Sequence, residues 1–416
     1  MRKPSQIAVV AAAMAALTGC VSARMSDHEP DLLFKAGKYD EAAQKLTASY
    51  AKLGENSKDS LLYVLDIGLS LHSAGKYDEA IKQFQKADKL AEIKDYTSIA
   101  KESASILTGE NAKDYKAEDF ENVMISTYLA MDYALLGSQE DAVVEARRVN
   151  RKLLLMVAEG GRKYQQNAFA RYLSSVLYED EKDWNNAYID LKEAQKLEPG
   201  FPGLGRDLWR VAWLNGMDED MERWQSEYNL TAEDKRLARE LAPKNKKAEI
   251  IVLYENGISP VKVPNPHFRT LPIFKPRWNP VSQAKISIDG HEAGLTQPLY
   301  NIESIAIQNL DEKYGTLIAR RIGGMVAKEV VADQVGRQTN SPLLGALAKI
   351  ALYASDQADV RSWSLLPRDL QVARYTVEPG THTLRMEPSG AGAQFREKTV
   401  QVGAGKKVFV NFRYMP

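Results

Sequence analysis

The sequence of 416 residues has one cysteine and no excess of either charge. With a single thiol the chain cannot form an internal disulfide, so its fold must be stable without one. The 55 basic and 55 acidic side chains give a formal net charge of +0, which gives no indication of nucleic acid as a partner. The apolar run from Ile7 to Leu17 is shorter than the roughly 20 residues that a helix needs to span a bilayer.

The sequence also lacks the residue spacings of common metal-binding and catalytic motifs. Its five histidines are dispersed and never form a His-Glu-x-x-His pattern, and no Gly-x-Ser-x-Gly sequence is present. The most suggestive polar cluster is Asp359, Arg361 and Trp363, for which we favour a structural role, with the two charged side chains binding each other or the backbone. We therefore predict no catalytic and no metal-binding residue.

The first twenty residues have the pattern of a signal peptide. Arg2 and Lys3 form a short basic segment, the apolar run follows, and small residues close it. The segment ends in Leu17, Thr18, Gly19 and Cys20. This tetrapeptide resembles the lipobox of bacterial lipoproteins.

The lipobox resemblance implies that residues 1–19 are removed and that Cys20 carries diacylglycerol and an N-acyl chain. These lipids are the only attached group that we expect, and two or three chains hold a protein firmly where one does not. Residues 20–30 would then be a lipidated tether. Val21 rather than Asp follows the cysteine, and by resemblance to the sorting rules of enteric bacteria this implies a bacterial cell-envelope protein on the periplasmic face of the outer membrane.

A repeat is visible in the first half of the chain. The sequence Ala-Gly-Lys-Tyr-Asp-Glu-Ala occurs at 36–42 and again at 74–80. Small residues such as Gly68, and Phe84 in the following helix, are spaced to bring two antiparallel helices together. These residues resemble the tetratricopeptide repeat (TPR). We predict a TPR-like helical repeat over residues 31–228, with degenerate later units and an irregular stretch between about 90 and 120.

The resemblance to TPR proteins predicts which side chains line the concave groove of the repeat. The predicted groove residues are Leu65, Leu69, His72, Met124, Thr127, Met131, Leu135, Phe169, Tyr172 and Val176. This groove would be mostly apolar, which does not suit a charged peptide tail. It must be covered either by another part of this chain or by a partner. The alternative is that these side chains are ordinary packing between helices.

A basic cluster follows in the same half: Arg147, Arg148, Arg151 and Lys152. It is either a contact surface for an anionic partner or a solvated helix face. We favour the solvated face, because Glu145 is close enough along a helix to pair with these cations.

The second half of the chain has a different pattern. After a linker helix at 229–248, short alternating segments with turn residues between them predict strands over residues 249–416. The predicted strands are 249–254, 284–288, 299–307, 370–377, 381–387, 395–402 and 407–414. We therefore predict a multidomain α+β protein, in which a TPR-like α-solenoid precedes a small antiparallel β-sandwich-like domain.

The β-rich part is interrupted by a helical insertion at about 311–358. Apolar residues recur there at helical spacing, from Ile318 to Val330 and from Leu343 to Ala354. We interpret the two helices as a cover for a sheet face or for the repeat groove. Contact with a membrane or a partner is the alternative.

Several segments together resemble a family of bacterial tetratricopeptide-repeat lipoproteins. They are Ala358 to Pro367, Val372 to Arg374, Pro379 to His382, and Glu145 to Asn150. The resemblance spans most of the mature chain. It implies an architecture and a location rather than a mechanism.

Our leading hypothesis is a noncatalytic, lipid-anchored periplasmic scaffold whose TPR-like groove binds an envelope protein. The membrane would be contacted through the lipid, and no nucleic acid is expected. The alternative hypothesis is a protein or enzyme that acts on cell-wall or surface polysaccharide, with a site formed only by the fold. Such sites pair carboxylates with aromatic side chains, and the 6 Trp and 19 Tyr leave that open.

Overall fold

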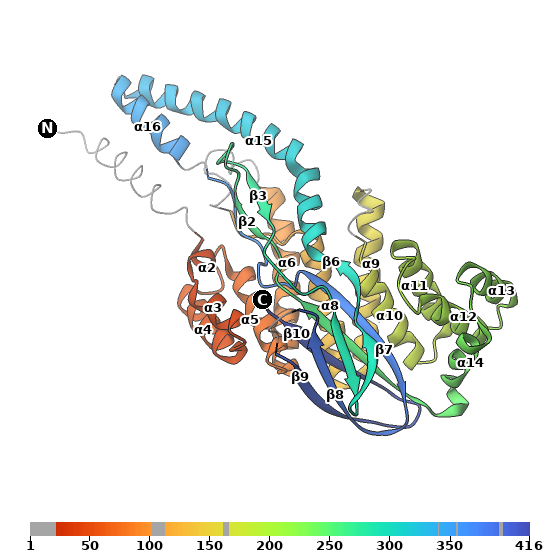
Figure 1. Ribbon diagram of the computed structural model, residues 1–416. Helices are drawn as coiled ribbons and strands as arrows, with labels where there is room; N and C mark the ends of the chain where they lie inside the picture. Colours follow the sequence, from red (N-terminus) through yellow and green to blue (C-terminus); the bar gives the residue numbers. More distant parts are fainter. Residues whose placement is uncertain (1–21, 102–112, 161–165, 340, 355–356, 391–393) are drawn as a thin grey trace.

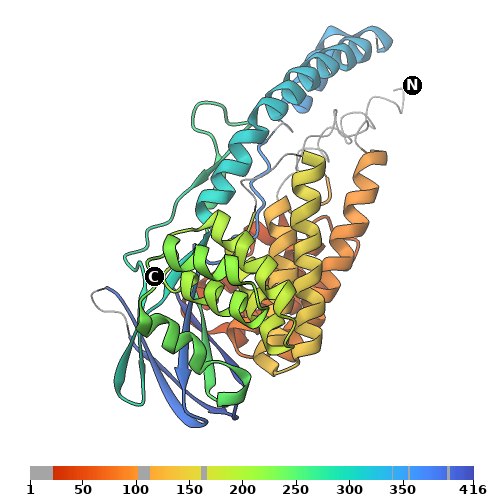
Figure 2. The ribbon, with the colours of Figure 1, turned by 90° about the vertical axis from the view of Figure 1, so that its right-hand side faces the viewer.

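The computed structural model describes residues 22–101, 113–160, 166–339, 341–354, 357–390 and 394–416 (Figures 1 and 2). The predicted lipobox and signal peptide therefore lie outside the described residues. Among the described residues, no helix combines the length and the apolar composition that crossing a bilayer requires.

The first half is a stack of antiparallel helices in which each packs against the next. Its helices are α2 (Ala23–Ser26), α3 (Glu29–Lys35), α4 (Tyr39–Leu53), α5 (Ser60–Ser73), α6 (Tyr77–Lys101), α8 (Asp119–Leu136), α9 (Gln139–Gly160), α10 (Ala168–Asp180), α11 (Trp184–Leu197), α12 (Leu204–Leu214), α13 (Asp218–Glu227) and α14 (Ala232–Glu240). Contacts run from α3 to α4, α4 to α5, α5 to α6, α6 to α8, and so on to α12 and α13. The predicted TPR-like solenoid is confirmed.

One turn geometry recurs between paired helices. Gly37, Gly75, Gly137, Lys182 and Gly216 each have positive φ, between 60° and 78°. In each turn the following residue donates its backbone N–H to a carbonyl five positions earlier, as Lys76 does to Leu71 (2.9 Å). The glycines of the repeated sequence therefore lie at these turns, which is why they indicated the helix pairs. Lys182 takes the same conformation without a glycine, which is why the sequence showed that unit less clearly.

The close helix approach predicted at Gly68 is also present. A Cβ atom on Gly68 would lie 2.8 Å from the ring of Phe84 on the next helix. The ring fills the space that glycine leaves, so the two helices of this unit pack closely.

The second half contains two four-stranded sheets and a hairpin. Its strands are β1 (Ala248–Asn256), β2 (Val261–Pro264), β3 (Pro272–Lys275), β4 (Ala284–Ile288), β5 (His291–Leu295), β6 (Gln297–Asn301), β7 (Asp369–Val377), β8 (Gly380–Pro388), β9 (Arg396–Val402) and β10 (Lys407–Tyr414). The first sheet has the order β10-β1-β7-β6 and the second β5-β4-β8-β9. They pack face to face around Ile286, Leu384, Met386, Val252 and Phe412.

The sheets are mostly antiparallel, as predicted, with one exception. β10 pairs with β1 in parallel, so the last strand of the chain lies beside the first strand of the β-rich half. A parallel pair requires a long connection between its strands. The rest of the β-rich half provides that connection.

The boundary of the helical insertion differs from the sequence prediction. The predicted strand 299–307 ends at Asn301, and the long helix α15 (Ile302–Gln338) begins there, followed by α16 (Pro342–Ala354). The Asn301 side chain accepts a hydrogen bond from the backbone of Ser304 (2.9 Å), which caps the helix. Ile302, Ala306 and Leu310 are buried at helical spacing. The apolar residues within 302–307 were therefore wrongly predicted to alternate as in a strand, whereas they follow the spacing of a helix.

The segment predicted as a tether is folded from residue 22 onward. Ser22 caps α2 and donates to the Asp59 carboxylate (2.9 Å), and the Arg24 backbone donates to the same oxygen. The Arg24 side chain is buried and donates to Asp66 (2.7 Å). These contacts fix the start of the described chain on α5, so residues 22–30 are not a free tether.

Candidate functional site at the interface of the two halves

The first sheet is buried on both faces, by the second sheet on one side and by the helical repeat on the other, as the side chains of β1 show. Ile250, Val252 and Tyr254 face the second sheet. Ile251 and Leu253 belong instead to a core that continues into the helical repeat. Side chains alternate along a strand. The helix-facing positions of β1 therefore run from Glu249 through Ile251 and Leu253 to Glu255.

This sheet face fills the predicted groove. Nine of the ten predicted groove residues are buried, from Leu65, which is 0% exposed, to Tyr172, which is 2% exposed, and Leu135 is half-buried. α8 contacts β10, and α10 contacts β6 and β7. The groove is thus covered by the chain itself. An envelope protein can reach these residues only if the two halves separate.

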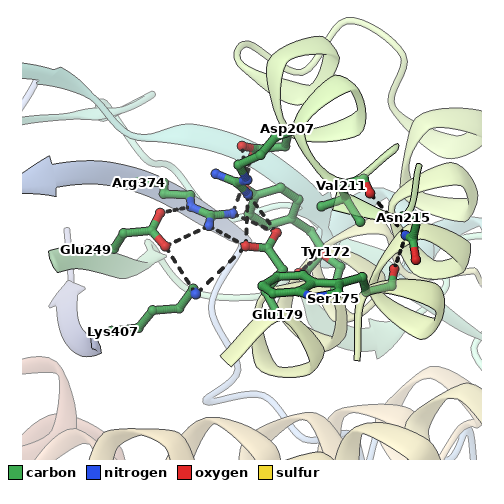
Figure 3. A network of polar contacts seen from close by, with 11 residues as sticks. Tyr172, Ser175, Glu179, Asp207, Val211, Asn215, Glu249, Arg374 and Lys407 are labelled. Atoms are coloured by element: carbon green, nitrogen blue, oxygen red, sulfur yellow. Dashed lines mark hydrogen bonds and ion pairs between the residues drawn. The ribbon is translucent and has the colours of Figure 1, made fainter. Parts of the chain in front are cut away.

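The covering sheet brings charged side chains into this interface (Figure 3). Glu179 on α10 accepts from Arg210 on α12 (2.8 Å and 2.9 Å) and from Arg374 on β7 (2.6 Å). Arg374 also donates to Glu249 on β1 (2.9 Å), and Lys407 on β10 lies 3.2 Å from the same carboxylate. None of these five side chains is more than 10% exposed.

Asp207 on α12 completes this cluster. It accepts from the hydroxyl of Tyr172 (2.7 Å), and one of its oxygens lies 3.3 Å from Arg210. The cluster then has three cations, Arg210, Arg374 and Lys407, and three anions, Glu179, Asp207 and Glu249. Balanced charge is what permits such burial.

The two glutamates of this cluster are held ionised. Burial alone would raise the pKa of Glu179, but the positive charges of Arg210 and Arg374 lower it below its usual value. The pKa of Glu249 is lowered in the same way by Arg374 and Lys407, against the effect of burial. Neither carboxyl is therefore available as a proton donor near neutral pH.

A second cluster surrounds His72, one of the predicted groove residues. Its Nδ1 contacts Asp132 on α8 and its Nε2 contacts Glu255 on β1 (2.9 Å). Glu255 also accepts from the Tyr128 hydroxyl (2.7 Å) and from Arg413 on β10 (2.6 Å). His72, which was predicted to line the groove, thus contacts a strand of the same chain.

The two carboxylates keep His72 protonated. Burial would lower the pKa of His72, but Asp132 and Glu255 raise it to about 9. Burial raises the pKa of Asp132 to about 6, although His72 opposes that change. Near neutral pH the cluster therefore has two cations, His72 and Arg413, facing two anions. It is a structural ion cluster rather than an acid–base pair.

The predicted cluster of Asp359, Arg361 and Trp363 joins the two halves. Arg361 donates to Asp359 (2.7 Å) and to Asp59 at the start of α5 (3.2 Å). The backbone of Trp363 donates to Glu121 on α8 (2.8 Å), and its ring packs against Phe84 and Tyr128. The structural role that we favoured for these residues agrees with the geometry.

The predicted basic cluster on α9 divides into structural and exposed members. Arg148 and Lys152 contact Asp88 on α6 (2.9 Å and 2.8 Å), and Arg147 lies over the ring of Tyr178. Arg151 is exposed. The favoured reading, a solvated face with local pairing, fits this geometry, although Arg148 pairs more closely with Asp88 than with Glu145.

An open hollow of about 370 Å³ lies between α3, β8 and the C-terminal residues. Trp278, which is 77% exposed, lines it together with Lys35, Tyr39, Arg396 and Arg413. None of the residues that line this hollow is acidic. It does not provide the facing carboxylates that glycoside hydrolysis requires.

Five charged strand residues of this interface were not predicted from the sequence: Glu249, Glu255, Arg374, Lys407 and Arg413. A signal for them exists, because Glu249 and Glu255 share a strand face with apolar Ile251 and Leu253. Charges at alternate positions of a strand that is otherwise apolar indicate a face buried against complementary charge. The part of the chain that the structure describes has no cluster of three or more His, Asp or Glu that could bind a metal.

Comparisons with known proteins give similarity for the helical half. No protein-family model and no curated protein matches the chain. The crystal structure of MamA is 13% identical, with a TM-score of 0.33, and covers 50% of this chain and 95% of its own. A putative kinesin light chain of Podosopora anserina with TPR-like repeats has the same identity and TM-score, and covers 52% and 94%. At these values the similarities carry no argument about activity or partners.

The ion cluster of Figure 3 depends on Arg374. We expect Arg374→Met to lower the free energy of unfolding by about 3 to 5 kcal/mol, because Glu179 and Glu249 stay buried and lose a shared cation. Urea denaturation measures the change. Arg236→Met, which removes exposed contacts to Glu233 and Glu240, is the matched control and should leave the midpoint nearly unchanged. Equal effects of the two variants would contradict this account.

His72 gives the interface a dependence on pH. Its pKa is raised from the usual 6.5 to about 9, so its stabilising contribution is complete below pH 6.5 and is lost as the pH rises through 9. The free energy of unfolding should fall by roughly 3 kcal/mol over that interval. In His72→Gln this part of the fall should be absent. Denaturation at a series of pH values tests this, and parallel curves for the two proteins would refute it.

Proposed function

We propose that the protein is a noncatalytic, lipid-anchored scaffold of the bacterial cell envelope that binds a protein partner on the outer surface of its repeat. The observation that carries the proposal is the closed groove. TPR-like grooves commonly receive a partner, whereas here the chain's own sheet occupies that space with paired charges. The repeat then acts as a rigid support, and contact with a partner belongs to the exposed outer helices.

The outer face of α9 is the surface that best suits a protein partner. Val144, Leu154 and Leu155 are 53%, 62% and 45% exposed, and Arg151 lies between them. Protein interfaces are enriched in arginine, and large exposed apolar groups in a cluster often mark them. The polysaccharide alternative receives no comparable support.

The proposed anchor follows from the lipobox resemblance at residues 17–20. Ser22 lies two positions after Cys20 and is fixed to Asp59, so lipid on Cys20 would hold the folded body close to the membrane surface. Such an anchor, with no long tether, would restrict the orientation of the scaffold.

The anchor is tested by growing cells that express the protein with labelled palmitate. We expect the label in the native protein, which should sediment with membranes, and no label in Cys20→Ala. Leu32→Glu, an exposed change on α3, should keep the label. Palmitate in the Cys20→Ala protein, or none in the native protein, would refute the anchor.

The partner surface is tested by affinity capture from solubilised envelopes, with mass spectrometry of the recovered proteins. We expect a defined partner with the native protein, and at least about tenfold less of it with the double variant Leu154→Glu and Leu155→Glu. Leu32→Glu is the matched control, because Leu32 is 65% exposed on a distant helix. Equal recovery by both variants would remove α9 from the proposal.

A further inference from the structure

The helices α15 and α16 form an arm that projects from the body (Figures 1 and 2). The arm is defined here as residues 311–339 and 341–354. Its base is fixed to the body, because Lys313 and Asn309 on α15 contact Glu118 at the start of α8 (2.6 Å and 3.0 Å). Beyond this base, the predicted role of the insertion as a cover for a sheet or the groove is wrong, because most of its apolar side chains are exposed.

The exposed apolar side chains follow one side of α15. Ile322, Val326 and Val330 are 60%, 62% and 61% exposed, and Ile318 continues the row at the same spacing of four. On α16, Leu343 is 69% exposed. Side chains four residues apart lie one above another on a helix, so they form a continuous apolar strip. Such a strip is unfavourable in water unless something covers it.

The two helices of the arm contact each other through small residues. A Cβ atom on Gly345 would lie 3.1 Å from the Cα of Gly336 and 3.3 Å from the carbonyl oxygen of Ala332. The close contact is therefore between backbones, while the large apolar side chains point outward. Helices in water usually pair by burying those side chains. Small residues at the contact and large apolar residues outside are typical of helices that pair in lipid.

The charge of the arm suits an anionic lipid surface. The arm contains six basic side chains, Lys313, Arg320, Arg321, Lys328, Arg337 and Lys349, and four acidic ones, Asp311, Glu312, Glu329 and Asp333, so its net charge is 6 − 4 = +2. α16 has a single charged residue, Lys349, among its 13 residues. Positive charge beside apolar surface favours binding to membranes with anionic lipid.

The segment that follows the arm, from residue 357 onward, and the start of the described chain meet at one carboxylate. Arg361, shortly after α16, donates to one oxygen of Asp59 (3.2 Å), and Ser22 donates to the other (2.9 Å). The exit of the arm therefore lies beside the residue that follows the proposed lipid site by two positions. A membrane that holds Cys20 would be close to the root of the arm.

We propose that the arm lies in the surface of the bilayer to which Cys20 is attached, with Ile322, Val326 and Leu343 in the acyl boundary and its solvent-exposed basic residues at the phosphates; Lys328, which is buried, is not among them. α16, with 13 residues, is too short to span a bilayer, which needs roughly 20, and α15 carries charged residues from Arg320 to Arg337, so the arm is placed at the interface. The identity of this bilayer rests on the proposed anchor. The lipid affinity of the arm does not.

The test uses the full chain with Cys20→Ala, which has no other thiol, and introduces Val326→Cys for an environment-sensitive fluorophore. Vesicles of phosphatidylethanolamine and phosphatidylglycerol should shift the emission to the blue. The matched control is Ile189→Cys on α11, which is 45% exposed and should show no shift. Adding Ile322→Asn and Leu343→Asn to the labelled chain should weaken vesicle binding at least about tenfold.

Three outcomes would overturn the proposal. The first is no change at Val326→Cys with vesicles, and the second is an equal change at Ile189→Cys, which indicates adsorption of the whole protein. The third is a change at Val326→Cys that needs no vesicles and grows with protein concentration, which assigns the arm to a second copy of the chain. The variants of this test carry Cys20→Ala and therefore have no lipid anchor. A failure to bind vesicles would not change the palmitate result, and a failure of the palmitate test would not change the vesicle result.

Discussion

Charge buried between the first sheet and the helices is the constraint on which the arrangement of the chain depends. Glu249 and Glu255 lie on the helix-facing side of β1, and neither is more than 4% exposed. β10 runs parallel to β1 with Lys407 beside Glu249 and Arg413 beside Glu255, so the strands supply part of the compensating charge themselves. The helices supply the rest: His72 faces Glu255, and Arg210 lies near Glu249, while Glu179 balances the cations Arg210 and Arg374. Removing one member of such a set leaves a charge unpaired in an apolar surrounding, so other registers of sheet and helices are strongly disfavoured.

This constraint changes what the repeat can do. The concave surface of a helical repeat is normally its binding surface, because it is large and its shape is fixed. In this chain the same surface encloses a sheet, and the apolar residues predicted to hold a partner complete a core shared by both halves. The repeat is made more rigid by this core, and its groove is no longer open to a partner. Apolar surface remains exposed on α9 and on the arm. The molecules that bind these two surfaces would then determine the function.

The local structure could be predicted from the sequence to a large extent, because its signals are local. The glycine turns identified the helix pairs, and alternation placed β4, β7, β8, β9 and β10 within one residue or so of their bounds. A covered groove was predicted, but whether the chain or a partner covers it was left open, because the answer depends on contacts such as that of His72 with Glu255, which are 183 positions apart. The parallel pairing of β1 and β10 is equally long-range. The start of α15 was missed for a local reason, since a short apolar run fits a strand and a buried helix turn alike.

The interface also relates the two elements that we connect with a membrane. The chain start at Ser22 is fixed to the helical repeat, whereas the arm emerges from the β-rich half, and Asp59 contacts both Ser22 and Arg361, which follows the arm in the chain. If the halves moved independently, lipid on Cys20 would not determine where the arm lies. The ion clusters around Glu179 and His72, together with the shared core, hold the halves in one relative position. The buried charges would thereby set the orientation of the whole scaffold on its membrane, and with it the direction in which α9 faces a partner.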